Sequence, residues 1–163
     1  MPLGENMIKV RNLIEWTDKL SIGIEEIDEQ HKVLVNLLNR LHAAIIQRND
    51  TEVLEEILDE LAQYTVIHFS VEESLMRIFN YPDYEEHKQH HKELTLQVVE
   101  LKEKIRKEKL SISIEVLMFL RHWLTHHILV DDKKYEPFFV QHGLQKTWSE
   151  RSWAGKIWDN LLK

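Results

Sequence analysis

Four segments of this 163-residue chain carry apolar residues at alternating steps of three and four, and each of these stripes also contains histidine. Such steps keep side chains on one face of an α-helix, so each stripe predicts a helix whose apolar face lies toward a common axis. The first two stripes are Ile27, His31, Leu34, Leu38, Leu41, Ile45 and Leu54, Leu58, Leu61, Thr65, His68, Glu72, Leu75, Phe79. The other two are His87, His91, Leu94, Val98, Leu101, Ile105 and Leu117, Leu120, Leu124, His127. The pattern predicts an all-α four-helix bundle.

The breaks between the predicted helices are short. Asp50 and Thr51 offer a helix stop followed by a new N-cap, and Pro82 follows a turn at a place suited to starting a helix. Residues 109–113 form the third break. Loops this short join antiparallel neighbours, which predicts an up-down-up-down topology.

The length of the chain suits one compact domain with short additions at both ends. We expect an N-terminal arm over residues 1–15, the helical domain over residues 16–139 and an amphipathic C-terminal extension over residues 140–163. The extension carries three tryptophans, Trp148, Trp153 and Trp158, and predicts an additional helix that packs on the bundle. Docking of a protein partner, self-association or contact with a membrane surface are its alternative roles.

Composition excludes several classes of function. With 21 Lys and Arg against 28 Asp and Glu, the formal charge of −7 disfavours nucleic acid as a partner. No apolar run is long enough to cross a bilayer, and the first residues lack the apolar core of a signal peptide, so we expect a cytoplasmic protein without a transmembrane segment. The absence of cysteine excludes disulfides and iron–sulfur clusters.

Histidine and acid side chains on apolar stripes need compensation, because burying an unpaired polar or charged group costs roughly several kcal/mol. The pairs His68/Glu72 and His87/His91 are each four residues apart, so the members of a pair lie on one helix face and can reach one ion. A single stripe histidine such as His31 is more often a hydrogen-bonded core residue. Five of them with acids, spread over all four helices, favour a metal site.

The donor types limit the choice of metal. Neutral imidazole with carboxylate suits iron, copper, zinc or manganese. Seven donors exceed what one ion takes from a protein, so two ions are implied, and a carboxylate that bridges two cations is tolerated at such depth.

At this point the sequence resembles the hemerythrin family, specifically its bacterial members. The resemblance covers about Trp16 to Phe139, with the motifs in the family's order and spacing. The matching stretches are Asp28-Glu29-Gln30-His31, His68-Phe69-Ser70-Val71-Glu72-Glu73, Tyr81-Pro82 leading into His87-Lys88-Gln89-His90-His91, and Trp123-Leu124-Thr125-His126-His127-Ile128 running to Asp132 and Tyr135.

The resemblance implies a ligand set for two iron ions. One iron would be bound by His87, His91 and His127 and the other by His31 and His68, while Glu72, Asp132 and an oxo or hydroxo group would bridge them. Dioxygen would bind at the position left open on one iron. The resemblance also implies an apolar oxygen pocket, although plain core packing explains the same residues: Leu34, Phe69, Trp123, Leu124 and Ile128.

Neighbouring residues compete for some of these roles. Asp132 lies five residues after His127, about 140° round an ideal helix, whereas Asp131 at four residues would share its face. The resemblance favours Asp132, because the family's own spacing is five and helices distort near metal sites. His126 and His90 compete with the histidines that follow them, but both fall off the apolar stripes and are expected to face outward.

The donor set favours reversible oxygen binding, as in a carrier, a storage protein or a delivery protein, and we expect no enzyme activity. Di-iron enzymes on helix bundles typically use four acids and two histidines in Glu-x-x-His pairs, and the predicted site has none of these pairs. Five imidazoles and two acids disfavour the high-valent iron that cleaves O–O bonds. An oxygen- or redox-sensing interaction module is the main alternative, and a di-iron oxidase or peroxidase ranks below it.

Overall fold

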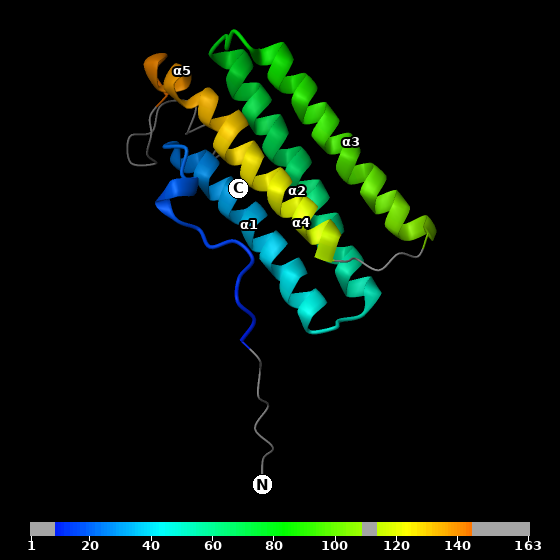
Figure 1. The fold of residues 1–163 in the computed structure, drawn as a ribbon. Coiled ribbons are helices and arrows are strands. Elements are labelled where there is room, and N and C mark those ends of the chain that lie inside the picture. Colours follow the sequence, from blue (N-terminus) through cyan, green and yellow to red (C-terminus); the bar gives the residue numbers. More distant parts are fainter. Residues whose placement is uncertain (1–8, 109–113, 145–163) are drawn as a thin grey trace, which may run out of the picture.

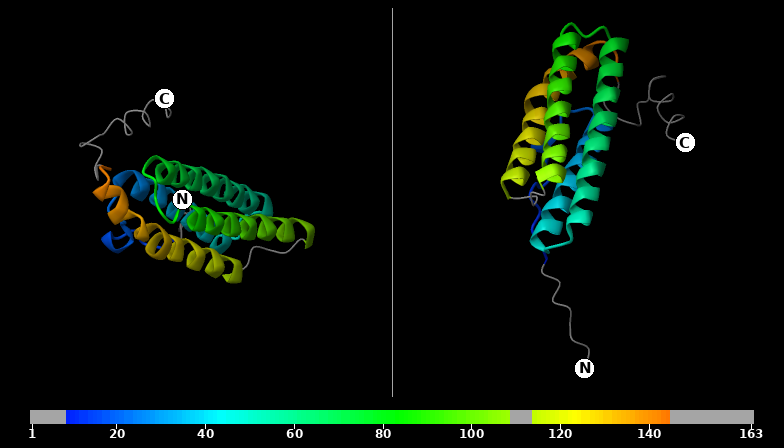
Figure 2. Two further views of the ribbon diagram at one scale, coloured as in Figure 1. Left: turned by 90° about the horizontal axis from the view of Figure 1, so that it is seen from above. Right: turned by 90° about the vertical axis from the view of Figure 1, so that its right-hand side faces the viewer.

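A computed structural model describes residues 9–108 and 114–144 and shows four long helices packed side by side (Figures 1 and 2). They are α1 (Glu25–Ile46), α2 (Thr51–Ile78), α3 (Tyr84–Glu108) and α4 (Ile114–His126). Successive helices run in opposite directions; α1 contacts α2 and α4, and α2 contacts α3. The described ranges contain no strand. The predicted all-α up-down-up-down bundle is confirmed.

The helices α1 and α2 are each followed, two residues after their last residue, by a residue with a left-handed backbone. Asn80 has a left-handed backbone, with φ of 53°, and Arg48 has φ of 54°. After Asn80 the chain turns back, so the Tyr81 N–H donates to the Met76 carbonyl at 2.8 Å and caps the end of α2. Asparagine tolerates this backbone better than most residues do. The breaks predicted at Asp50 and Thr51 and at the turn before Pro82 coincide with the junctions between the observed helices, while residues 109–113 lie outside the described residues.

The chain after α4 does not continue as a regular helix. A single π turn, η2 (His127–Asp131), is followed by a 3-10 turn, η3 (Asp132–Lys134), and by the short helix α5 (Glu136–Gln141) at the end of the bundle (Figure 1). Residues 145–163, which include the tryptophans of the predicted extension, lie outside the described residues. The additional C-terminal helix predicted there stays a prediction.

The segment that precedes α1 is fixed to the bundle by hydrogen bonds. Ile14 is buried, its N–H donates to Asn39 Oδ1 at 3.0 Å, and Asn39 Nδ2 donates to the Ile14 carbonyl at 2.8 Å. A 3-10 turn, η1 (Asp18–Leu20), follows. The Ile22 N–H then donates to Asp28 Oδ1 at 2.8 Å, which holds the entry to α1. Part of the predicted N-terminal arm thus packs against α1.

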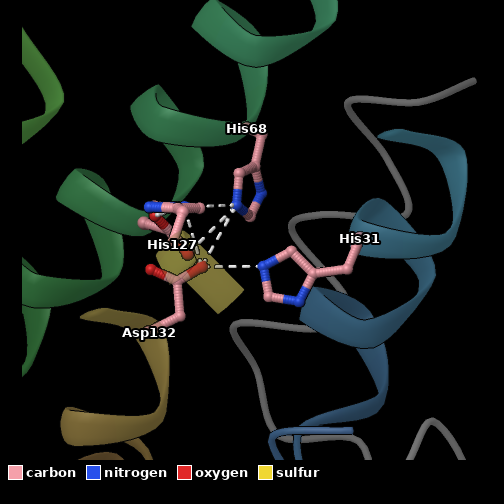
Figure 3. A group of neighbouring side chains, drawn as sticks. His31, His68, His127 and Asp132 are labelled. Atoms are coloured by element: carbon pink, nitrogen blue, oxygen red, sulfur yellow. Dashed lines mark hydrogen bonds and ion pairs between the residues drawn. The ribbon is translucent and has the colours of Figure 1, made fainter. Parts of the chain in front are cut away.

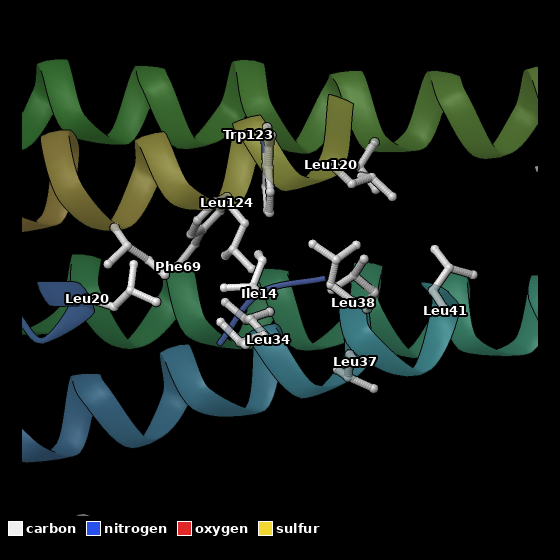
Figure 4. Close-up of a cluster of buried hydrophobic side chains, with 14 of the residues drawn as sticks. Ile14, Leu20, Leu34, Leu37, Leu38, Leu41, Phe69, Leu120, Trp123 and Leu124 are labelled. Atoms are coloured by element: carbon white, nitrogen blue, oxygen red, sulfur yellow. The ribbon is translucent and has the colours of Figure 1, made fainter. Parts of the chain in front are cut away.

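Apolar side chains fill the interior beyond the polar cluster described below (Figure 4). Leu34, Leu38 and Leu41 of α1 are almost fully buried, and Leu120 and Leu124 of α4 are buried equally. The predicted stripes hold with small exceptions, since five of their members are only half-buried: Ile45, Leu75, Phe79, Leu94 and Leu101. Within the described ranges, no helix has both the length and the apolar character needed to cross a membrane.

Candidate metal centre

Five imidazoles and two carboxylates meet inside the bundle, close to the end where α5 lies. They come from α1, α2 and α3 and from the η2 and η3 turns that follow α4. Each is buried, with between 0% and 8% of its surface exposed. They are the seven donors predicted from the sequence: His31, His68, Glu72, His87, His91, His127 and Asp132.

Asp132 lies at the centre of this cluster (Figure 3). Its Oδ2 is 2.7 Å from His31 Nε2, 2.9 Å from His127 Nε2 and 3.4 Å from His68 Nε2. Its other oxygen, Oδ1, is 3.5 Å from His87 Nε2. One carboxylate therefore faces imidazoles from α1, α2, α3 and the segment after α4.

Glu72 is the second shared carboxylate. Its Oε1 is 3.1 Å from His68 Nε2, and its Oε2 is 2.9 Å from His91 Nε2 and 3.7 Å from His127 Nε2. It thus faces imidazoles from its own helix, from α3 and from η2.

The donors form two groups, in each of which the ligand atoms lie within 4.8 Å of one another. Glu72 and Asp132 belong to both groups; one adds His31, His68 and His127, and the other adds His87 and His91. The resemblance predicts His127 in the second group. Its ring centroid is almost equally far from both, 5.5 Å from His68 and 5.4 Å from His91. Its assignment to one ion stays a prediction.

Two of the imidazoles are oriented by acceptors behind them. His68 Nδ1 donates to Gln30 Oε1 at 2.7 Å, and His91 Nδ1 donates to Glu73 Oε1 at 3.1 Å. An amide oxygen and a carboxylate can only accept, so each ring carries its proton on Nδ1. The Nε2 lone pair of each ring then points into the cluster, as metal binding requires.

Tyr135 is a third supporting residue. It is fully buried, and its hydroxyl donates to Glu72 Oε1 at 2.5 Å. Burial, together with the negative charges of Asp132 and Glu72, raises the pKa of Tyr135 well above its usual range. The hydroxyl therefore keeps its proton and holds the carboxylate in place.

Sequence reasoning did not assign these supporting roles. Gln30 lies three residues after Ile27 on the buried face of α1, so a polar residue on an apolar stripe was the available signal. Glu73 directly follows a predicted donor, but nothing in its spacing distinguishes it from a solvated acid. Tyr135 belonged to the matching stretches without a role of its own.

Charge is balanced inside the cluster in spite of burial. Burial disfavours the charged form of His127, but the adjacent Asp132 carboxylate outweighs it and raises its pKa to about 10. The nearby carboxylates of Asp132 and Glu72 likewise outweigh burial at His87 and raise its pKa to about 9. The pKa of Asp132 is held well below its usual range, because the charge of His127 outweighs burial. At His31 burial prevails and lowers the pKa.

The free donor atoms of the cluster fit metal ions. His87 Nε2, His91 Nε2, Glu72 Oε2 and Asp132 Oδ1 are buried and have no hydrogen-bond partner in the described part of the chain. Each unsatisfied buried group costs about 1–3 kcal/mol. Imidazole and carboxylate donors are those that borderline divalent ions such as Fe²⁺ and Zn²⁺ prefer, so bound ions would remove this cost.

The rival positions lie outside this buried cluster. Regular helix geometry would place Asp131 on the face of His127, but the π turn η2 brings the residue five positions later, Asp132, into the cluster instead. His126 is exposed, and His90 is partly exposed and pairs with Asp131. The expected outward direction therefore holds for His126, whereas His90 turns toward Asp131.

Apolar and aromatic side chains enclose the cluster. The five residues of the predicted oxygen pocket, Leu34, Phe69, Trp123, Leu124 and Ile128, are all buried. Phe69 stacks on the His91 ring at a centroid distance of 3.8 Å, and Trp123 is nearly parallel to the His127 ring at 6.2 Å. Their contact with dioxygen stays a prediction.

Comparison with known proteins agrees with this geometry. The family model described as the Hemerythrin HHE cation binding domain matches residues 22–139. The chain belongs to the hemerythrin family. Among its hemerythrin relatives, the bacteriohemerythrin of Stenotrophomonas maltophilia is 35% identical over 146 residues, which cover 88% of this chain and 94% of that protein.

More distant hemerythrins match over a similar span. The bacteriohemerythrin of Methylococcus capsulatus is 32% identical over 77% of this chain and 95% of its own length. A hemerythrin-like protein of Naegleria gruberi is 31% identical over 74% of this chain and 89% of its own length. A crystal structure of wild-type hemerythrin superposes with a TM-score of 0.71 at 29% identity, covering 78% of this chain and 98% of that one.

Proposed function

We propose that this hemerythrin binds dioxygen reversibly at a centre of two iron ions held by the seven buried side chains. The observation that carries the proposal is the convergence of imidazole nitrogens and carboxylate oxygens in two groups that share Glu72 and Asp132. Two ferrous ions, when bound, supply the electrons that dioxygen needs in order to bind and recover them on its release. The bacteriohemerythrins and hemerythrins that the chain resembles support this choice.

The two ions would receive unequal numbers of imidazoles. By the family resemblance, His87, His91 and His127 hold one ion, His31 and His68 hold the other, and Glu72 and Asp132 bridge the two. The ion with two imidazoles leaves room for dioxygen. Tyr135 and Gln30 support the site by holding Glu72 and His68 in their orientations.

The apolar side chains beside the cluster would protect bound dioxygen from irreversible reduction. Phe69, Trp123 and Leu124 are buried, Phe69 and Trp123 lie against imidazoles of the cluster, and this apolar side would shield the cluster from water and protons. Where solvent protons reach the site slowly, reduced oxygen species leave it slowly, which keeps oxygen binding reversible. The absence of Glu-x-x-His pairs among the seven donors favours this carrier chemistry over oxygen activation.

Anaerobic reduction of the iron-loaded protein followed by exposure to air tests the proposal. We expect two iron ions per chain by elemental analysis and a visible absorption band that appears in air and disappears under argon over repeated cycles. Asp132→Asn should lose both, whereas His142→Ala, an exposed histidine of the segment after α5, should retain both. One ion per chain, or rapid consumption of oxygen with substrate turnover, would contradict the proposal.

A further inference from the structure

A second group of metal-binding side chains lies outside the buried centre. It consists of His90 on α3, His126 at the end of α4 and Asp131 at the end of η2. One ligand atom of each lies within 4.8 Å of those of the others. His90 Nε2 is 2.6 Å from Asp131 Oδ2, and His126 Nδ1 is 3.8 Å from the same oxygen. The consecutive helices α3 and α4 and the η2 turn thus bring three donors together.

These donors can be reached from solvent. The side chains of His126 and His90 are 48% and 36% exposed, and that of Asp131 is 11% exposed. Two imidazoles and one carboxylate can hold Fe²⁺ on one face and leave its other positions to water. The same set also suits Zn²⁺. This combination differs from an acidic surface cluster, because imidazole selects borderline transition-metal ions over Ca²⁺ or Mg²⁺.

A pocket of about 360 Å³ joins this outer group to the buried centre. Its lining includes His90 and Asp131 of the outer group and His87 of the buried cluster. Asp83, Glu86 and Glu93 also line it, against one basic residue, Lys134. The excess of acidic side chains draws cations toward the pocket.

The two groups also meet through Asp131. Its Oδ2 lies 3.8 Å from His127 Nδ1, on the side of that ring opposite to the nitrogen that faces Asp132. A cation near Asp131 would therefore be separated from the buried cluster by one imidazole ring.

We propose that His90, His126 and Asp131 form an outer site for one divalent transition-metal ion, and that Fe²⁺ held there passes through the pocket to His87 to fill the buried centre. The transfer exchanges ligands and waters around Fe²⁺ and changes no oxidation state. The existence of the outer site is independent of the proposed function, whereas the filling role rests on it.

Zinc titration of the full-length, iron-loaded protein tests the outer site. We expect one Zn²⁺ per chain by calorimetry, with the iron content unchanged by elemental analysis. His90→Ala and His126→Ala should each weaken zinc binding by at least about tenfold, since each removes a ligand. No bound zinc, or zinc binding that survives His90→Ala, would overturn the site.

Two exposed histidines provide matched controls for this titration. His142→Ala should leave zinc binding unchanged, because His142 lies after α5 and outside the outer group. His122 lies one turn before His126, with ring centroids 5.9 Å apart, and the two could form a rival pair. Loss of zinc binding in His122→Ala, with His90→Ala unaffected, would assign the ion to that pair and overturn the proposal.

The rate at which the buried centre takes up iron tests the proposed filling role of the outer site. Iron-free protein is mixed anaerobically with Fe²⁺, and the iron that resists a fast chelator is measured over time. We expect His90→Ala and His126→Ala to fill several-fold more slowly than wild type but to reach the same final iron content, with His142→Ala filling at the wild-type rate. Equal rates in all four proteins would overturn the filling role. If the wild-type chain retains no iron, that role fails together with the proposed function, while the zinc titration still decides the outer site.

Discussion

Three of the buried imidazoles each direct one ring nitrogen into the cluster and the other toward a residue outside it. His68, His91 and His127 direct Nε2 inward, while their Nδ1 atoms face Gln30, Glu73 and Asp131. At His68 and His91 the acceptor is within hydrogen-bond distance and fixes the rotation and the tautomer of the ring, so that the ring need not reorganise when an ion binds. At His127 the Asp131 carboxylate lies 3.8 Å from Nδ1. At the scale of single residues, the site thus depends on side chains that would not touch the two buried ions.

Replacing Gln30 tests this dependence. Gln30→Ala removes the acceptor of His68 Nδ1 and should lower iron affinity by about 10–100-fold, the usual cost of losing such a partner. Affinity is measured by competition with a ferrous chelator. Asn36→Ala is the matched control, because Asn36 is an exposed polar residue on the same helix. Equal affinities in wild type and Gln30→Ala would show that the hydrogen bond plays no part.

Tyr135 permits a second test at this scale. Tyr135→Phe removes the hydroxyl that donates to the buried Glu72 carboxylate and should lower the free energy of unfolding by about 1.5–3 kcal/mol. Urea denaturation followed by circular dichroism measures the change. Tyr84→Phe is the control; its hydroxyl accepts from Arg77 at an exposed position, and its loss should cost less than about 0.5 kcal/mol. Equal costs for the two variants would contradict the role of Tyr135.

Six of the seven donors could be predicted because each interrupts an apolar stripe, and an interruption needs a physical reason; Asp132 lies beyond the fourth stripe and was predicted from the family resemblance. Gln30 interrupts a stripe as well, but a neutral amide is easily accommodated in a core by one hydrogen bond, so its position did not by itself indicate a role at a metal site. Glu73 lies at the edge of the buried face of α2, where burial depends on how α3 packs. Single-helix periodicity contains no such information about neighbouring helices.

At the scale of elements, the π turn at the end of α4 decides which acid enters the cluster. Regular helix geometry, at about 100° per residue, favours Asp131 on the face of His127. The π turn adds one residue, which brings Asp132 to His127 and leaves Asp131 beside His90. Apolar spacing predicted the four helices, but it assumes a regular helix and could not predict this local widening; only the family resemblance favoured Asp132.

Deleting one residue from the π turn tests its role. Val130 is exposed, and its deletion should convert η2 into a regular α-helical turn in which Asp132 stands four residues after His127 and keeps its place. We expect helical content and two bound metal ions per chain to be retained. The matched deletion of Phe119, exposed in the regular part of α4, should rotate the following donors His127 and Asp132 by about 100° relative to the preceding turns and abolish metal binding. Loss of metal in both deletions would refute this account of the turn.

At the scale of the whole molecule, the buried cluster makes stability depend on pH. In the iron-free protein, His127 and His87 have pKa values of about 10 and about 9. A raised folded-state pKa gives stabilisation that is complete below the unfolded value of about 6.5 and is lost as the pH rises through the folded value. The lowered pKa values of Glu72 and Asp132 act in the opposite sense, with stabilisation lost as the pH falls below about 4.

The iron-free protein should therefore be most stable between about pH 5 and 6.5 and lose stability steadily up to about pH 10. Urea midpoints measured across this range by circular dichroism check the prediction. The iron-loaded protein is the comparison. Metal binding requires neutral imidazoles, so iron affinity should rise with pH and should offset the loss of stability that the iron-free protein shows. A flat stability curve for the iron-free protein above pH 6.5 would refute the charge balance assigned to these histidines.

The hydrogen bond between His31 and Asp132 joins residues 101 positions apart in the sequence. Ribosomes release a chain from its amino end, so α1, α2 and α3 emerge before His127 and Asp132 exist. A nascent or prematurely terminated chain thus lacks the carboxylate shared by both donor groups. Metal binding by both complete donor groups can therefore follow only after the fourth helix has been synthesised.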